Sequence, residues 1–227
     1  MDLARLSPQE FVEHILVRGL QVRAVLVGEN FRFGHKQAGD VALLRELGAR
    51  HGFAVEIIPP VALDGEIVSS TAIRREIASG NISHAARLLG RPFALSGDIV
   101  PGTGRRFTFA TLNLKPEQEL LPARGVYVTR TLLEGETKSR RSVTNVGMRP
   151  TFNGASLSVE THLLDFSGEV TAKRMEVRFW KRLREEKKFT GPDELRLQIA
   201  RDIAAANKFF TRLRRFKSIW QPTTARG

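Results

Sequence analysis

Up to about residue 91, apolar residues recur at helical spacing or in short unbroken runs. Ser7–Glu10 forms a capping box with proline at the first helical position, and a second helix is predicted to begin near Asp40. Residues 23–27 and 53–58 are apolar runs of strand length. This alternation of helices and strands predicts a parallel α/β unit, which two short helices follow before residue 91.

After residue 92 the pattern changes to short segments of alternating apolar and polar residues, separated by Gly, Pro and Asn. Strands are predicted over 93–100, 107–114, 125–131, 142–146, 158–166 and 175–180. Short strands with such turns predict a small antiparallel, Greek-key-like β-barrel. A long helix begins near Pro192, and the apolar stripe that should pack it on the barrel is formed by Leu195, Ile199, Ile203, Ala206 and Phe210.

These patterns divide the chain into an α/β domain (residues 1–91), a barrel domain (residues 92–217) and a flexible tail (residues 218–227). The 227 residues are 41% hydrophobic and 26% charged, which is typical of globular proteins. There is no cysteine, which excludes disulfides and thiolate metal sites. The absence of cysteine also favours the reducing cytoplasm. No apolar run reaches membrane-spanning length, so we expect no membrane partner.

The formal net charge of +12 leaves the class of partner open. A basic protein can bind nucleic acid, an anionic membrane surface or a substrate that carries several phosphates. A solvated basic surface without a specific partner fits the charge equally well. Charge alone therefore does not decide the function.

A glycine-rich turn with arginines runs into a strand that ends in Thr-Leu-Asn, and this is the strongest sign of chemistry. Gly102, Gly104 and Arg105 would let backbone N–H groups and a guanidinium group approach the phosphates of ATP. Thr111 and Asn113 supply neutral oxygen atoms, which suit Mg²⁺ when a nucleotide brings most of the negative charge. The alternative is an ordinary glycine turn with exposed arginines.

A second candidate segment alternates so that Ser158, Glu160 and His162 share one face of a strand. Together with the phosphate site, Glu160 suggests phosphoryl transfer, in which it would act as the general base. A solvated carboxylate on the outer face of the barrel is the alternative. We assign no role to His162, because a lone histidine on a barrel strand is more often structural.

Asn30, Phe31, Arg32 and Phe33 lie between two glycines after the first apolar run. Open α/β sheets bind ligands at this end of their strands, and the two phenylalanine rings could sandwich a planar ring. The rings could equally plug the edge of the sheet. The pattern does not separate these alternatives.

Ser69, Ser70, Thr71 and Arg74 mark the start of a predicted helix. A serine here is an ordinary N-cap, which is the structural interpretation. The free N–H groups of the first turn and the arginine would also form an anion site.

Taken in order, these stretches resemble the bacterial bifunctional riboflavin kinase/FAD synthetase family, from Leu6 to about Phe210. The order and spacing of the matches, more than any one of them, carry the resemblance. The matching segments are VGENFRFG (27–34), Gly39-Asp40, VSSTAIR (68–74), LLGRP (88–92), residues 102–113, GVY (125–127), TNVGMRPTF (144–152) and VETHLLDF (159–166).

This resemblance implies a barrel domain that uses ATP and Mg²⁺ to phosphorylate riboflavin, giving FMN. It implies that the metal and base residues named above serve this reaction, and that Asn145, Arg149 and Thr151 belong to a mobile loop near the substrates. The first domain would be a remnant of a Rossmann-like nucleotidyltransferase domain. Residues 30–33 and 69–74 would then be the remnant of a flavin or nucleotide site. The implied partners are riboflavin, FMN and ATP.

Two features depart from the family pattern. The nucleotidyltransferase half of the family normally begins with a His-x-x-His-type segment that binds ATP phosphates, and no such segment occurs in this chain. We therefore expect an N-terminally truncated member without FAD synthetase activity, whose first sheet exposes an edge or a face. Ala110 replaces the family's proline before Thr111, which leaves the chemical groups in place but stiffens the backbone less.

Two functions from other classes remain as alternatives. A non-catalytic flavin- or nucleotide-binding protein would also fit the missing ATP-binding segment. A basic nucleic-acid-binding barrel would fit the charge, although the chain has a single tyrosine and few aromatic residues placed to stack on bases.

Overall fold

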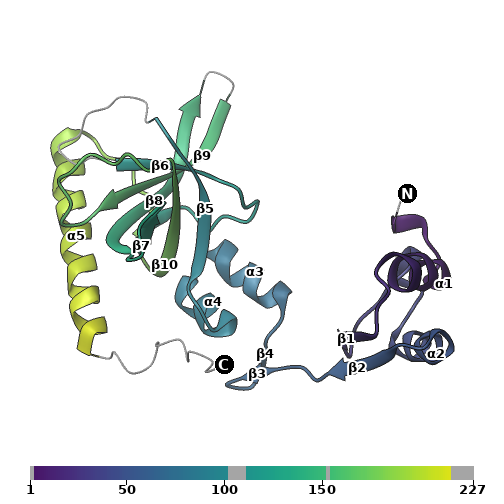
Figure 1. The fold of residues 1–227 in the computed structure, drawn as a ribbon. Helices are drawn as coiled ribbons and strands as arrows, with labels where there is room; N and C mark the ends of the chain where they lie inside the picture. Colours follow the sequence, from purple (N-terminus) through teal and green to yellow (C-terminus); the bar gives the residue numbers. More distant parts are fainter. Residues whose placement is uncertain (1–2, 102–110, 152–153, 216–227) are drawn as a thin grey trace. The chain divides into compact units, whose positions relative to one another are not determined.

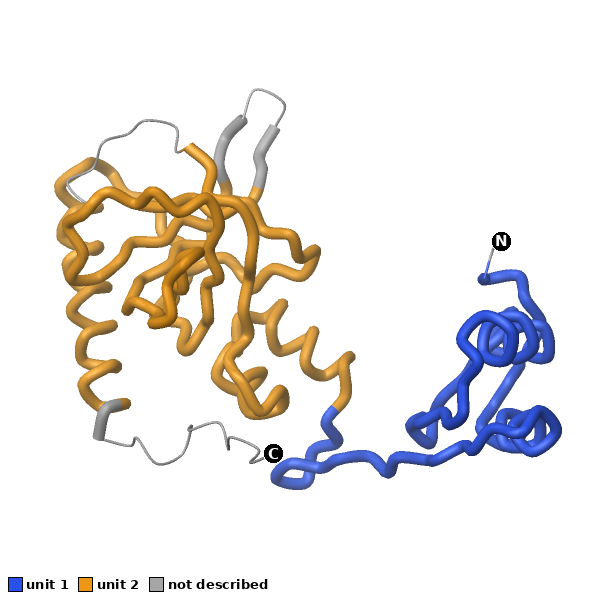
Figure 2. Tube along the Cα trace, in the orientation of Figure 1, with its two compact units in different colours: residues 1–68 blue, residues 69–227 orange. Residues whose placement is uncertain are grey.

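The chain divides into two units, residues 1–68 and residues 69–227 (Figure 2), of which the computed structural model describes residues 3–101, 111–151 and 154–215. Unit 1 contains short helices, a two-stranded parallel sheet and a small hairpin (Figure 1). Its elements are η1 (Leu3–Arg5), α1 (Pro8–Glu10), the π-helical η2 (Phe11–Gly19), β1 (Ala24–Gly28), η3 (His35–Gln37), α2 (Val41–His51), β2 (Ala54–Ile58), β3 (Ala62–Leu63) and β4 (Glu66–Ile67).

The helix ends of unit 1 follow the local signals in the sequence. The predicted capping box is present: Glu10 N donates to Ser7 Oγ at 3.2 Å, and Ser7 N donates to Glu10 Oε2 at 2.8 Å. Asp40 caps α2 by accepting a hydrogen bond from Leu43 N at 2.9 Å. Gly52 ends α2 in the left-handed conformation, with φ of 78°. The predicted parallel pairing of the two apolar runs is confirmed as β1 and β2.

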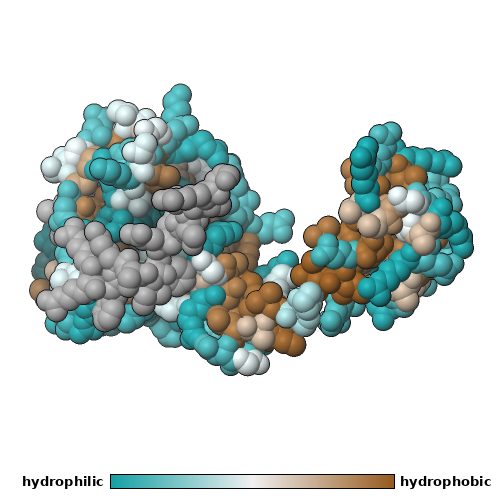
Figure 3. All heavy atoms as spheres, turned by 60° about the horizontal axis from the view of Figure 1, so that its bottom comes forward, coloured by the Kyte–Doolittle hydropathy of each residue, from teal (hydrophilic) through white to brown (hydrophobic). Residues whose placement is uncertain are grey.

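One face of the β1–β2 sheet packs against η2 and α2, and the other is largely exposed. Val27 and Leu44 are buried in this core. On the exposed side, Leu26 is 60% and Ile58 is 39% exposed. Figure 3 shows the resulting hydrophobic surface on unit 1. Alternate side chains of a strand point to opposite faces, so a sheet covered on one side leaves every second apolar residue in water.

Unit 2 is a closed six-stranded barrel with three helices around it (Figure 1). The barrel order is β10-β5-β6-β9-β8-β7 and every pairing is antiparallel, which confirms the predicted barrel. The elements are α3 (Ser70–Ser79), α4 (Ile82–Leu89), β5 (Phe93–Val100), β6 (Thr111–Pro116), β7 (Gly125–Leu133), β8 (Arg140–Thr151), β9 (Gly154–Leu163), β10 (Arg174–Glu185) and α5 (Pro192–Arg215).

The predicted strands are present, but some of their ends differ. β8 and β9 pair as far as Thr151 opposite Gly154, so both extend into the segment that the family resemblance implied to be a mobile loop. The predicted strand over 107–114 is described only from Thr111 onwards, as β6. The tail over 218–227 lies outside the described residues.

The interior of the barrel contains a chain of hydroxyl groups besides its apolar side chains. Thr131 bonds to Ser142, Ser142 to Thr129, and Thr129 to Thr144, each at 2.8 Å, and Thr144 bonds to Thr161 at 2.9 Å. All of these residues are fully buried. Because buried hydroxyl groups must be paired, this chain ties β7, β8 and β9 to one register.

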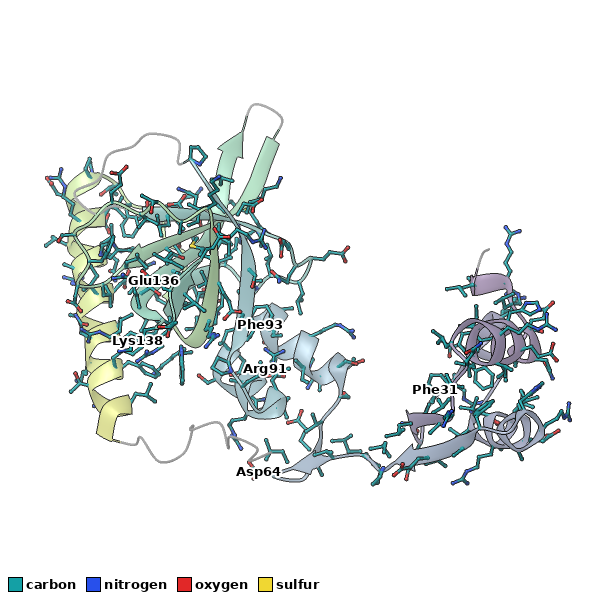
Figure 4. All side chains as sticks on the ribbon, in the orientation of Figure 1. Phe31, Asp64, Arg91, Phe93, Glu136 and Lys138 are labelled. Carbon is teal, nitrogen blue, oxygen red and sulfur yellow. The ribbon has the colours of Figure 1, made fainter. Side chains whose placement is uncertain are left out.

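The boundary between the units lies earlier than the predicted domain boundary at residues 91 and 92. α3 and α4 belong to unit 2, because Ile77, Ile82 and Ala85 are part of the apolar core of the barrel. Arg91 and Phe93 mark the short passage from α4 into β5 (Figure 4). The change from helical to strand periodicity near residue 91 predicts a domain boundary there. The apolar faces of α3 and α4 instead complete the core of the barrel that follows them.

α5 packs along the outer face of β7, β8 and β10. Ala206 and Phe210 of the predicted apolar stripe are buried against it, whereas Leu195 and Ile199 are only partly buried. Arg184 of β10 forms a paired contact with Asp202 of α5, with Nη2–Oδ2 at 2.8 Å and Nε–Oδ1 at 3.1 Å. No helix in the described part of the chain is both long and apolar enough to cross a membrane.

Glu194 organises the start of α5. Its carboxylate accepts hydrogen bonds from Lys187 Nζ at 2.8 Å and from the backbone and side chain of Thr190, each at 3.0 Å. These donors favour the charged form and lower the pKa of Glu194 from its ordinary value of 4.5 to about 2. The ionised side chain therefore ties the segment before α5 to its first turn.

Ile82→Ala should destabilise unit 2 although it changes a helix outside the barrel. Ile82 is 1% exposed in the barrel core, and removing such a side chain costs about 2–5 kcal/mol. Denaturant unfolding of the full chain measures the loss. Ile67→Ala is the control, because Ile67 is 59% exposed. Equal stability of the two variants would show that α4 is not part of the core.

Replacing Glu194 by Gln should change how the stability of the protein depends on pH in the acidic range. A carboxylate with a lowered folded-state pKa stabilises the protein above its unfolded pKa, and this contribution is lost as pH falls from about 4.5 to about 2. The stability difference between the wild type and Glu194→Gln should therefore shrink over this window. Thermal melts of both proteins at a series of pH values measure it, with the exposed Asp193→Asn as control. A difference that is constant with pH would contradict this role.

Candidate active site

The residues proposed for phosphoryl transfer lie in one row across three neighbouring strands. Asn113 of β6 is directly opposite Glu160 of β9, and Glu160 is directly opposite Asn145 of β8. Directly opposed residues of antiparallel strands carry their side chains on the same face, about 4.5–5.5 Å apart at Cβ. We call Asn113, Glu160 and Asn145 the reactive row.

Thr111 lies on the same face as the reactive row. It is two residues before Asn113 on β6, and side chains two apart on a strand share a face. Its directly opposed partner is His162, two residues after Glu160 on β9. The hydroxyl group, the amide and the carboxylate predicted from the sequence therefore come from adjacent strands and point to one side.

The reactive row is on the outer face of the barrel, because the residues that alternate with it fill the inside. Leu114, Val146 and Val159 all belong to the interior core. Asn113 is nevertheless only 6% exposed, while Glu160 is partly exposed. The site thus combines a buried amide with a carboxylate that solvent can reach.

The donor set restricts how a metal ion could be held. No group of three or more His, Cys, Asp or Glu side chains in the described residues is placed to hold a metal ion. Thr111 and Asn113 contribute neutral oxygen atoms, which bind a hard cation weakly unless other oxygen ligands join them. This arrangement suits a metal ion that arrives with nucleotide phosphates.

The row continues in register toward α5. Asn145 is opposite Val126 of β7, and Val126 is opposite Arg184 of β10. Val126 lies in the apolar cluster with Ala206 and Phe210, and Arg184 holds Asp202 of α5. The helix is therefore attached to the barrel at the level of the reactive row.

The segment of the predicted substrate loop is a strand, and the role of its residues near the substrates stays a prediction. Part of the predicted phosphate site lies outside the described residues. The segment that carries Asn145, Arg149 and Thr151 is strand β8, paired with β9 throughout. Only Asn145 of these has a described side chain, since those of Arg149 and Thr151 lie outside the described residues. The predicted phosphate-binding residues Gly102, Gly104 and Arg105, together with Ala110, also lie outside them.

Of the two alternatives for Phe31 and Phe33, the ring sandwich does not fit the structure, because the two rings stack on each other. The ring centroids of Phe31 and Phe33 are 5.7 Å apart with an interplanar angle of 14°, which leaves no room for a third ring. Phe33 is 5% exposed and belongs to the core. Phe31 (Figure 4) instead lines an open groove of about 420 Å³, whose other lining residues are Glu29, Asn30, Arg32, Asp40, Val41 and Ala42.

The second stretch of the predicted remnant site belongs to unit 2. Ser69 is the N-cap of α3 and accepts a hydrogen bond from Ala72 N at 3.1 Å, which confirms the structural interpretation. Ser70, Thr71 and Arg74 are exposed on the first turn of this helix. Residues 30–33 and 69–74 therefore lie in different units.

Two residues to which the sequence alone gave no role lie next to the candidate site. His162 is opposite Thr111, and Glu186 approaches β8 beside Asn145. The alternation of β9 already places His162 on the same face as Glu160. No sequence pattern, however, distinguishes a histidine of the site from one with a structural role. The sequence gives no functional signal for Glu186, because it is one of many charged residues in the segment 181–188.

Family comparisons agree with this arrangement. The riboflavin kinase family model matches residues 89–210, which is more than half of the chain and contains the barrel, most of α5 and the reactive row. The chain belongs to the riboflavin kinase family. The FAD synthetase family model matches residues 1–72 of the same chain. The resemblance inferred from the sequence is therefore confirmed.

Relatives from this family are similar over most of the chain. The bifunctional riboflavin kinase/FMN adenylyltransferase of Escherichia coli strain K12 is 39% identical over 209 residues, covering 91% of this chain and 66% of the relative. The protein of the same name from Pseudomonas fluorescens is 40% identical over 207 residues, covering 90% of this chain and 66% of the relative. The chain thus spans about two thirds of the length of these relatives.

A solved structure has the same fold. The crystal structure of a macrolide-efflux protein from Streptococcus pneumoniae has a TM-score of 0.76 and 28% sequence identity to this member of the riboflavin kinase family. The similarity covers 90% of this chain and 66% of that chain.

Proposed function

We propose that this chain is a riboflavin kinase, which transfers the γ-phosphoryl group of ATP to the 5′-hydroxyl of riboflavin and releases FMN and ADP. The observation that carries the proposal is the register of the reactive row within the family-matched barrel. Phosphoryl transfer needs positioned phosphates, a cation and help with the proton of the attacking hydroxyl. The row and Thr111 offer groups of the types that each of these tasks requires.

Thr111 and Asn113 would hold the cation, which we propose is Mg²⁺ bound with ATP. Their neutral oxygen atoms suit a hard ion whose remaining ligands are phosphate oxygens and water. Gly102, Gly104 and Arg105 of the preceding segment would bind the phosphates through backbone N–H groups and a guanidinium group.

Glu160 would be the general base. As the riboflavin oxygen forms its bond to the γ-phosphorus, its proton passes to the Glu160 carboxylate, and the bond from the γ-phosphorus to ADP breaks. Glu160 stands between Asn113 and Asn145 in the row, so it can face the acceptor hydroxyl while Thr111 and Asn113 of β6 hold the cation.

The direct test is incubation of the purified chain with riboflavin and Mg·ATP, followed by chromatography of the flavins. FMN formation supports the proposal, and riboflavin binding without FMN supports the non-catalytic flavin-binding alternative. Single-stranded nucleic acid binding that weakens steeply with salt, with no response to riboflavin, would favour the nucleic-acid alternative.

Glu160→Gln should lower turnover by about 10²–10⁴-fold, because the amide cannot accept the proton. ATP affinity and melting temperature should stay close to wild type, since the shape of the side chain is kept. Glu176→Gln is the matched control, a carboxylate on β10 that pairs with Arg178 away from the row. Near-wild-type turnover of Glu160→Gln would remove Glu160 from the mechanism.

We propose that this chain alone does not convert FMN to FAD. Its five histidines include no His-x-x-His pair, although the FAD synthetase family model matches residues 1–72. Incubation with FMN and Mg·ATP should leave FMN unchanged, and clear FAD formation would overturn this part of the proposal. We further propose that the chain works in the cytoplasm without a membrane or nucleic-acid partner.

A further inference from the structure

Gly147 of β8 leaves a space that the ends of two neighbouring side chains border. A Cβ atom at this position would stand 2.6 Å from Glu186 Oε1 and 3.0 Å from Asn145 Nδ2. Both distances are at or below the closest approach that real Cβ atoms make, although the backbone of Gly147 is ordinary strand. A side chain here would have to displace the ends of Glu186 and Asn145, which come from two different segments and both border the space over Gly147.

Glu186 follows directly after β10 and reaches back to β8. Its Oε1 accepts a hydrogen bond from Met148 N at 3.3 Å, and its Oε2 lies 3.8 Å from Arg124 Nη1. The side chain is 34% exposed, so the contact is partly sheltered from water. Two residues earlier, Arg184 holds Asp202 of α5. This short segment therefore links α5 to β8.

The contact point is next to the reactive row. Asn145 shares its face of β8 with Gly147 and is directly opposed to Glu160 on β9. The amide of Asn145 thus lies opposite the proposed base and borders the same space over Gly147 as the Glu186 carboxylate. Glu186 therefore acts on β8, the strand that carries Asn145, and not on β6, which carries the proposed cation-binding residues Thr111 and Asn113.

We propose that Glu186 is a positioning residue for the reactive row, which holds β8 at Met148 and keeps the amide of Asn145 in place through the gap left by Gly147. This inference rests on the proposed kinase function. The contacts of Glu186 in the described residues are with Met148 of β8 and Arg124, so we expect its effect to fall on turnover and not on ATP binding. Displacing a positioned group by about 1 Å can cost about 10²-fold in rate.

Three variants of the full chain test the proposal: Glu186→Ala, Gly147→Ala and the double variant. Gly147→Ala pushes the flexible ends of Glu186 and Asn145 away and leaves the backbone free to keep its conformation. Both single variants should lower kcat for FMN formation by about tenfold to hundredfold, with KM for ATP within about twofold. The double variant should lose no more than the worse single variant, because both changes break the same contact.

Glu185→Ala is the matched control, since Glu185 is the neighbouring residue of the same type and its side chain is 86% exposed. It should keep wild-type kcat. Unchanged kcat in Glu186→Ala, multiplied losses in the double variant, or losses that merely follow a lowered melting temperature would each overturn the proposal.

Hydrogen exchange of the Met148 amide gives a readout that does not depend on catalysis. Its exchange should become faster in Glu186→Ala and Gly147→Ala and stay unchanged in Glu185→Ala. Unchanged exchange in Glu186→Ala would overturn the contact itself. A wild-type chain that forms no FMN would refute the proposed kinase function and with it the positioning role, while the exchange data would still decide whether Glu186 holds β8.

Discussion

The antiparallel register of β6, β9 and β8 is the constraint on which the candidate site depends. Asn113, Glu160 and Asn145 are far apart in the sequence and meet only because backbone hydrogen bonds set these strands side by side. A slip of one residue would turn Glu160 into the barrel and bring an apolar neighbour to the surface. The register is therefore both a folding constraint and a chemical one.

The inside of the barrel protects this register. Slipping β9 against β8 would separate the paired hydroxyl groups of Thr144 and Thr161, and a buried hydroxyl without a partner costs about 1–3 kcal/mol. The apolar residues around them would lose their packing at the same time. The hydroxyl chain and the apolar core thus favour the same strand register. That register also sets the positions of the reactive-row side chains on the outer face.

Elements outside the barrel complete the unit. α3 and α4 add Ile77 and Ile82 to the core, while α5 covers the outer face beside the reactive row. The link between Arg184 and Asp202 places a charged pair where Asp202 is only 6% exposed, and losing one partner of such a pair leaves an uncompensated charge. α3 and α4 therefore stabilise the barrel through its core, and α5 stabilises it on the outer face beside the reactive row.

Predictions from the sequence succeeded where the signal was local. Periodicity identified the strands, and the capping box at Ser7 and the glycine after α2 marked helix ends, because these depend on neighbouring residues alone. The predictions failed where contacts between residues distant in sequence determine the conformation or the environment of a residue. The resemblance implied a mobile loop around Arg149, but pairing with β9 keeps the segment extended. Phe33 suggested a ligand contact, but it packs into the core of unit 1.

By itself, the sequence determined the barrel, its long final helix and the residue types of the site. The apolar/polar alternation and the chemistry of each side chain can be read from the sequence directly. It also placed Thr111 with Asn113, and Glu160 with His162, on common strand faces. Only the tertiary structure decided that these two faces coincide, that α3 and α4 belong to the barrel, and that Glu186 reaches Gly147. The physical reason is that strand pairing and helix docking join residues distant in sequence, and no local pattern records the partner.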